Sequence, residues 1–80
     1  MSIIFTLHAL ERIRQRGIDK ELVRLCIQNP DREEENEGIH KCIKRVNNMV
    51  IIAIYRKEND NAIVITAYLS SKLHKYLETD

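Results

Sequence analysis

The hydrophobic pattern of the sequence changes its period near Pro30, and this change constrains the fold more than any other feature. Before Pro30, apolar residues recur every three or four positions, which is typical of one face of an amphipathic helix. After residue 38, apolar residues alternate with polar ones or run together, which is typical of β-strands. Helices in one part of a chain and strands in another indicate the α+β class, in which helices cover one face of an antiparallel sheet.

Two helices are expected in the first part of the chain, at about residues 7–16 and 20–28. Thr6 can accept a hydrogen bond from the first turn of the first helix, and Gly17 can adopt the left-handed conformation that ends it. Asp19 is a good N-cap for the second helix, which the following proline stops. The short connection between the helices implies a hairpin or an angled pair.

Three strands are expected after them, at about residues 39–46, 49–56 and 62–69. The last two are nearly continuous apolar runs, which are typical of central strands, and turns rich in asparagine join the strands as an antiparallel meander. The acidic segment 31–37 fits either a fourth strand at the edge or a solvated loop. Residues 70–80 form a polar tail with room for a short helix. The predicted architecture is two N-terminal helices packed on one face of a three- to four-stranded antiparallel sheet.

Length and composition predict a single domain that spans residues 1–80, with a hydrophobic content of 44% that is ordinary for a globular protein. The net charge is +1, so only a local patch could attract a polyanion. No segment approaches the roughly 20 apolar residues that span a bilayer, and the short apolar start lacks a basic region. These features predict a cytoplasmic protein with no contact to a membrane.

The sequence contains no recognisable cofactor or metal motif. His8, His40 and His74 are far apart and match no zinc spacing, and two glycines are too few for a phosphate-cradling loop. Cys26 and Cys42 are sixteen residues apart, which fits two reduced thiols better than a disulfide or a metal pair. We therefore expect no cofactor and no metal site.

His8, Arg12 and Arg16 are spaced by four residues and therefore form a row along one face of the first predicted helix. Neighbouring cations repel one another, so either an anion or nearby carboxylates must offset the repulsion. A phosphate would suit the two guanidiniums, which can bind it in a bidentate manner. The alternatives are salt bridges of the arginines with Glu11, Glu21 or the acidic segment, and a structural role for the histidine.

Further candidates lie on the predicted strands. Lys41, Lys44 and Arg45 could extend a cationic path, although their spacing places them on both faces of a strand, as in a solvated edge strand. Tyr55 and Tyr68 lie near the ends of the apolar strands, where a phenol can stack on a base, donate a proton or complete the core. The first four of these residues are the nucleic-acid-binding candidates, and Tyr68 joins the helical row as a catalytic candidate.

The first predicted helix carries a recognisable motif, which is Thr6-x-His8-Ala9-x-x-Arg12-x-x-x-Arg16-Gly17-Ile18. Later in the chain come Glu21, Pro30, a basic strand and two apolar strands that end in Tyr55 and Thr66-Ala67-Tyr68. This combination resembles a small uncharacterised prokaryotic family, the domain of unknown function 4258, over roughly Phe5 to Tyr68. The resemblance implies no established activity.

The size of the chain and the order of its predicted elements also resemble RelE-type toxins and the barnase–colicin nuclease group. This resemblance implies a metal-independent ribonuclease that acts on RNA and often pairs with an antitoxin. The chain departs from the toxins, which are usually strongly basic, in its net charge of +1 and its acidic run.

Taken together, these features predict an RNA-related function, either a metal-independent RNase-like toxin or a degenerate RNA-binding relative. Metal-free cleavage needs an acid, a base and cations beside the phosphorane, and His8, Arg12, Arg16 and Tyr68 could supply them. The expected partners are RNA and an antitoxin or another protein. The alternative is a non-catalytic protein-interaction module, or a homodimer, that docks through segment 31–37. A small-anion sensor is a third hypothesis.

Overall fold

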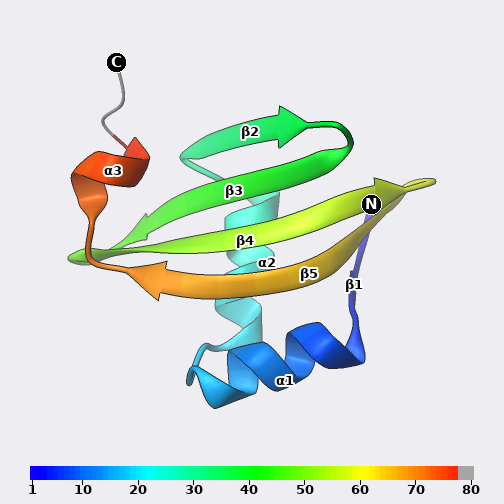
Figure 1. The fold of residues 1–80 in the computed structure, drawn as a ribbon, viewed down its shortest axis with the longest axis horizontal. Helices are drawn as coiled ribbons and strands as arrows, with labels where there is room; N and C mark the ends of the chain where they lie inside the picture. Colours follow the sequence, from blue (N-terminus) through cyan, green and yellow to red (C-terminus); the bar gives the residue numbers. More distant parts are fainter. Residues whose placement is uncertain (78–80) are drawn as a thin grey trace.

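A computed structural model describes residues 1–77 of the chain (Figure 1). In chain order, its elements are β1 (Ser2–Phe5), α1 (Leu7–Gln15), α2 (Lys20–Gln28), β2 (Arg32–Asn36), β3 (Ile39–Val46), β4 (Met49–Glu58), β5 (Asn61–Ser70) and α3 (Leu73–Leu77). The five strands form one sheet in the order β1-β5-β4-β3-β2. Strands β2 to β5 pair antiparallel, whereas β1 pairs in parallel with β5. The sheet is therefore mixed.

Capping residues determine where α1 begins and ends. Thr6 Oγ1 accepts a hydrogen bond from the Ala9 N–H at 3.0 Å and donates one to the Val64 carbonyl at 3.1 Å, so the cap also ties the helix to β5. Gly17 has a φ of 65°, and the N–H of the next residue donates to the Ile13 carbonyl at 2.8 Å. This geometry is the Schellman motif that the glycine predicts.

The sheet has two apolar faces that are covered to different extents. On the first, which we call the helix face, α1 and α2 enclose the larger core cluster. Its buried members are Ala9, Ile13, Ile18, Val23, Cys26, Ile27, Cys42, Ile51, Ala53, Tyr55, Ala62, Val64 and Ala67. On the second, which we call the open face, α3 packs at one end against a smaller cluster. Its buried members are Ile43, Val50, Ile52 and Tyr76.

The predicted architecture is wrong in four respects. The sheet has five strands instead of three or four, it is not purely antiparallel, and the chain begins with a strand instead of a helix. A third helix, α3, also packs on the face opposite α1 and α2. The strand β1 is only four residues long, and a short apolar run shows no reliable period until its pairing partner is known.

Most element bounds agree with the sequence pattern. The strand at 39–46 and the helix at 20–28 match β3 and α2, and Asp19 Oδ1 caps α2 by accepting a hydrogen bond from the Glu21 N–H at 2.9 Å. The strand expected at 49–56 extends two residues further, as β4, and the strand expected at 62–69 is one residue longer at each end, as β5. The acidic segment forms β2, so the edge-strand alternative is the observed one. Within the expected polar tail, α3 buries Tyr76, and residues 78–80 lie outside the described residues.

Candidate nucleic-acid interface

The basic row of α1 lies beside the edge of β5. The parallel pairing of β1 with β5 ends at Phe5 and Val64, and from there α1 runs along β5. At the far end of α1, Arg16 Nη1 donates hydrogen bonds to the Ala67 carbonyl at 2.8 Å and to Thr66 Oγ1 at 3.1 Å. A side chain therefore satisfies a backbone carbonyl that no strand pairs, and the guanidinium is held in one place.

Within residues 1–77, no carboxylate forms an ion pair with an arginine of this row. The ion pairs of the described residues join Glu21 to Arg24, Glu34 to Arg32, Glu33 to His40 and Glu58 to Arg56. None of the ion pairs found within residues 1–77 includes Arg12 or Arg16. The acidic segment lies in β2, at the opposite edge of the sheet. The salt-bridge alternative is therefore not the one that the described part of the chain adopts.

Tyr68 lies on the open face, near Arg16. Burial raises the pKa of the Tyr68 phenol to about 12, and a hydrogen bond with Tyr76 acts in the same direction. The charge of Arg16 acts in the opposite direction, because a nearby cation stabilises the phenolate. Tyr68 therefore keeps its proton at neutral pH, which suits a hydrogen-bond donor or a stacking surface better than a proton carrier.

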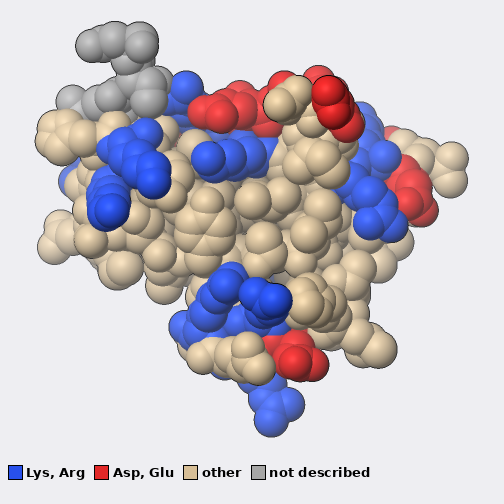
Figure 2. All heavy atoms as spheres, viewed as in Figure 1, with Lys and Arg blue, Asp and Glu red and all other residues tan. Residues whose placement is uncertain are grey.

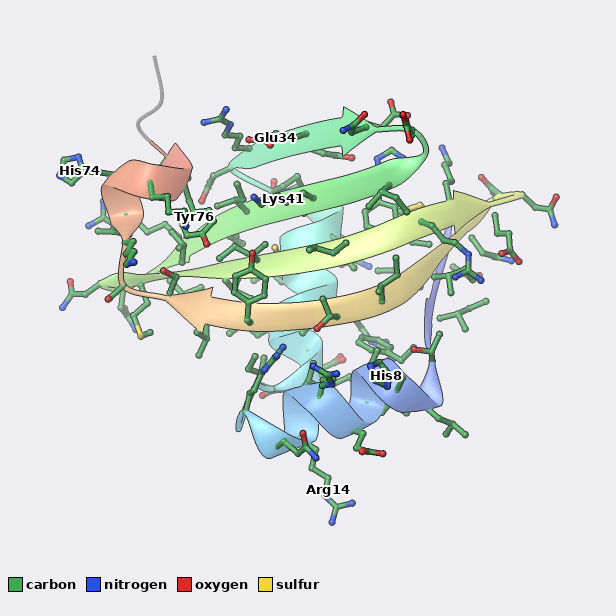
Figure 3. The ribbon with its side chains drawn as sticks, in the orientation of Figure 1. His8, Arg14, Glu34, Lys41, His74 and Tyr76 are labelled. Atoms are coloured by element: carbon green, nitrogen blue, oxygen red, sulfur yellow. The ribbon has the colours of Figure 1, made fainter. Side chains whose placement is uncertain are left out.

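His8 lies at the other end of α1 from Arg16. The two residues are eight positions apart, which is about 12 Å along the helix axis at 1.5 Å per residue. His8 is exposed, and Figure 3 shows it on the side of α1 that is turned toward the sheet, whereas Arg14 points away. The structure thus brings Arg16 and Tyr68 together and leaves His8 apart, although acid–base catalysis requires both partners at one phosphate.

The basic candidates on β3 are divided between the two faces of the sheet, as their spacing predicts. Lys44 belongs to the helix face, where its Nζ donates a hydrogen bond at 2.9 Å to the backbone carbonyl that follows α2. Lys41 and Arg45 belong to the open face. The Lys41 Nζ lies 5.2 Å from the centroid of the Tyr76 ring and pairs in register with Glu34 (Figure 3).

Tyr55 lies in the core on the helix face, with 5% of its surface exposed. Its ring stacks on that of His40 with centroids 4.7 Å apart, and its hydroxyl donates to Glu33 Oε2 at 3.2 Å. The same carboxylate oxygen lies 2.8 Å from His40 Nδ1. This cluster ties β2, β3 and β4 together and keeps Tyr55 away from the face that carries Tyr68. The sequence does not suggest it, because strand pairing alone brings its three members together.

A second basic cluster surrounds α3, and the sequence singled out only its arginine. An open pocket of about 610 Å³ lies between β3 and the segment that contains α3. Its lining residues are Arg45, Ser71, Lys72, Leu73, His74, Lys75 and Leu77. In Figure 2, basic side chains gather at this end of the open face and again over α1, with a largely uncharged surface between the two groups. No sequence period marks Lys72 and Lys75, because the first precedes a five-residue helix and the second lies within it.

The fold and this surface define a small α+β domain in which basic side chains border an open sheet face. The chain belongs to the family described as Domain of unknown function (DUF4258), whose model matches residues 5–69. The motif around α1 predicted this family. No curated protein and no solved structure matches the chain, so the resemblance to RelE-type toxins and the barnase–colicin group stays a prediction.

Two further findings concern other classes of site. Among the helices of residues 1–77, none has both the length and the apolar character needed to cross a membrane. In the same part of the chain, no three His, Cys, Asp or Glu residues lie close enough to hold a metal ion. Cys26 and Cys42 are free and buried, and burial raises the pKa of both thiols to about 12, so both stay protonated in the core at neutral pH.

Proposed function

We propose that the protein binds single-stranded RNA on the open face of its sheet, with Arg12 and Arg16 at the phosphates and Tyr68 against a base. The observation that carries the proposal is the placement of Arg16. Two hydrogen bonds hold its guanidinium beside Tyr68, and none of the carboxylates in residues 1–77 is paired with it. A fixed guanidinium with donors to spare loses little freedom on binding phosphate.

A single strand suits this surface better than a duplex. A base can stack on an aromatic ring only when it is not already stacked in a helix, and proteins that bind single strands combine aromatic rings with cations. The net charge of +1 provides little long-range attraction. Binding therefore depends on the local cations, and its affinity falls with salt at a log–log slope of about −0.7 per phosphate contacted.

The geometry favours binding over cleavage. His8 is about 12 Å along the helix from Arg16, and the raised pKa of Tyr68 makes this phenol a poor acid at neutral pH. The RNase-like toxin is therefore the less favoured form of the same RNA-related function. Cleavage can be distinguished from binding alone by examining the same RNA for cleavage products.

The test is the anisotropy of a fluorescent single-stranded RNA, titrated without metal at several salt concentrations. Arg16→Ala is expected to weaken binding by roughly tenfold, the value of one charge-assisted hydrogen bond. Arg14→Ala is the matched control, because it removes the same charge from the side of α1 that faces away from the sheet (Figure 3). Its effect is expected to be within about twofold.

Three outcomes would separate the hypotheses. A wild-type protein that shows no salt-sensitive binding, or equal losses in the two arginine variants, would overturn the proposal. RNA cleavage by the wild type, with none by a folded variant that carries both His8→Ala and Arg12→Ala, would establish the ribonuclease form instead. Circular dichroism of each variant establishes that it is folded.

A second candidate function is supported by the position of the acidic segment. We expect a protein-interaction module, or a homodimer, to use β2, which lies at the edge of the sheet and exposes Glu34 and Glu35. An extended segment of a partner can add to such an edge through backbone hydrogen bonds. Light scattering tests this candidate, because a stable dimer or hetero-complex that ignores RNA would favour it over RNA binding.

A further inference from the structure

We propose that the pocket beside α3 is a second binding site on the same surface and takes the terminal phosphate of the bound RNA strand. The inference rests on the RNA binding proposed above and adds the chemical class of the ligand, a nucleotide that carries a phosphomonoester. The residues expected to bind this phosphate are Arg45, Lys72 and Lys75.

The charge of the pocket is one-sided. Among residues 1–77, three of the residues that line the pocket are cations and none is acidic. The backbone N–H of Arg45 donates to Asp31 Oδ2 at 2.7 Å, and Arg45 Nε donates to the Asn47 carbonyl at 3.1 Å. The nearby carboxylate is thus bound to the backbone, and the anchored Nε sets the direction of the guanidinium. Its terminal amino groups retain donors for an anion.

The pocket also has the size and the walls that a nucleotide requires. Its volume of about 610 Å³ lies within the roughly 300–1,000 Å³ that small-ligand sites occupy. Leu73 and Leu77 provide apolar wall for a base or a sugar, and Ser71 provides a hydroxyl. A terminal phosphomonoester carries about −1.5 to −2 charges at neutral pH, whereas an internal phosphodiester carries one. Three cations around one pocket therefore favour an end of the strand over its interior.

The position of the pocket connects it to the first site. Tyr68, the aromatic residue of the first site, forms a hydrogen bond with Tyr76 of α3. Figure 3 shows Tyr76 directed from α3 onto the sheet beside Lys41, and Figure 2 shows the uncharged surface that leads from here toward α1. Neighbouring strands are about 4.8 Å apart, so the path from β5 to β3 is about 10 Å, which a few nucleotides cover. One strand can therefore contact both basic groups.

The experiment compares six-nucleotide RNAs of one sequence that carry a 5′-phosphate, a 3′-phosphate or neither. The wild type is expected to bind one phosphorylated form roughly tenfold more tightly than the unphosphorylated form. A double variant, Lys72→Ala with Lys75→Ala, is expected to lose this difference, so that it binds the phosphorylated and the unphosphorylated RNAs within about twofold of each other.

The matched control carries Lys20→Ala and Lys57→Ala. It removes the same charge away from the pocket, and Lys20 lies 5.4 Å from the Phe5 ring just as Lys75 lies 5.4 Å from the Tyr76 ring. The control variant is expected to keep the preference for the phosphorylated RNA. Equal binding of all three RNAs by the wild type, or a preference that survives in the Lys72→Ala, Lys75→Ala variant, would overturn the inference and leave the RNA proposal intact.

Adenosine monophosphate distinguishes a strand end from a free nucleotide. If it perturbs the amide resonances of residues 71–77 as strongly as the phosphorylated RNA and with equal affinity, the site belongs to a free nucleotide and the link to an RNA strand is overturned. If the wild type binds no RNA, the proposed function fails first. The titration with adenosine monophosphate then tests the pocket by itself. Perturbed amide resonances of residues 71–77 support an anion site there, and unperturbed ones exclude it.

Discussion

The β5 edge and the β2 edge of the sheet are protected from further strand pairing in different ways. Along β5, the short strand β1 pairs with the first half of the edge, α1 lies beside the second half, and Arg16 binds the Ala67 carbonyl. Along β2, none of the described residues adds a further strand, and the strand instead carries Glu33, Glu34 and Glu35. Charged residues on an exposed edge discourage indiscriminate pairing and aggregation with other chains. One edge is thus closed by packing and the other is protected by charge.

This difference separates the charges of a nearly neutral chain. Two strands lie between β5 and β2, so the edges are about 15 Å apart at a spacing of about 4.8 Å per strand. That distance exceeds the Debye length of about 8 Å at physiological salt, so the carboxylates of β2 hardly screen the arginines of α1. Figure 2 shows acidic side chains along β2 and basic ones over α1. The chain therefore has a local basic surface although its net charge is only +1.

The largest effect is expected from removing the packing that closes the β5 edge. Ile13 of α1 is 3% exposed, and Ile13→Ala should lower the free energy of unfolding by about 2–5 kcal/mol. Ile39 on the β2 side is 40% exposed, and Ile39→Ala should cost less than about 1 kcal/mol. Urea denaturation measures both values. If Ile13→Ala does not fold, Ile13→Val should still cost about 0.5–1.5 kcal/mol. Equal losses at the two positions would show that packing does not distinguish the edges.

A smaller effect on stability is expected from removing the side-chain hydrogen bond that links β2 to β4. Tyr55→Phe removes the hydroxyl that donates to Glu33 and should cost about 1 kcal/mol at neutral pH. Hydrogen exchange should then become faster at the amides of β2. Tyr68→Phe, on the open face of the sheet, is the control and should leave the exchange rates of these amides unchanged. Equal exchange in the two variants would contradict the role of Tyr55.

The same variant has an expected signature at high pH. Burial raises the pKa of Tyr55 from its ordinary 10 to about 12, so the folded state binds the phenolic proton more tightly than the unfolded state. The stability that this proton contributes is fully present below about pH 10 and is lost as the pH rises through about 12. Tyr55→Phe should therefore flatten the decline of the melting temperature over this range, whereas an unchanged decline would argue against it.

The smallest effect on stability is expected at Arg12, the exposed arginine in the middle of the basic row. Arg12 is exposed and has no ion pair within residues 1–77, so Arg12→Ala should change the free energy of unfolding by less than about 1 kcal/mol. Arg16→Ala should cost more, about 1–2 kcal/mol, because Arg16 satisfies a backbone carbonyl at the β5 edge. Urea denaturation compares the two variants. A loss of several kcal/mol at Arg12 would mean that it is a buried partner and not part of a free surface.

Local signals predicted more of the fold than of the site. The caps Thr6 and Asp19 and the glycine at position 17 place the helix ends, because each acts on residues within one turn. Both members of the Arg16–Tyr68 pair were candidates, although nothing in their spacing predicts that they meet. The lysines beside α3 were missed, because a five-residue helix is too short to show a hydrophobic period.

The sequence by itself determined α1, α2, the three long strands, the family and the residues of the basic row, because capping, period and motif are properties of neighbouring residues. Only the tertiary structure decided that β1 joins the sheet in parallel, that a third helix covers the open face at one end, and which cations remain unpaired. These features depend on contacts such as Arg16 with Ala67, whose partners are 51 residues apart. Pairing over such distances is selected by the packing of the whole domain, and no local pattern specifies it.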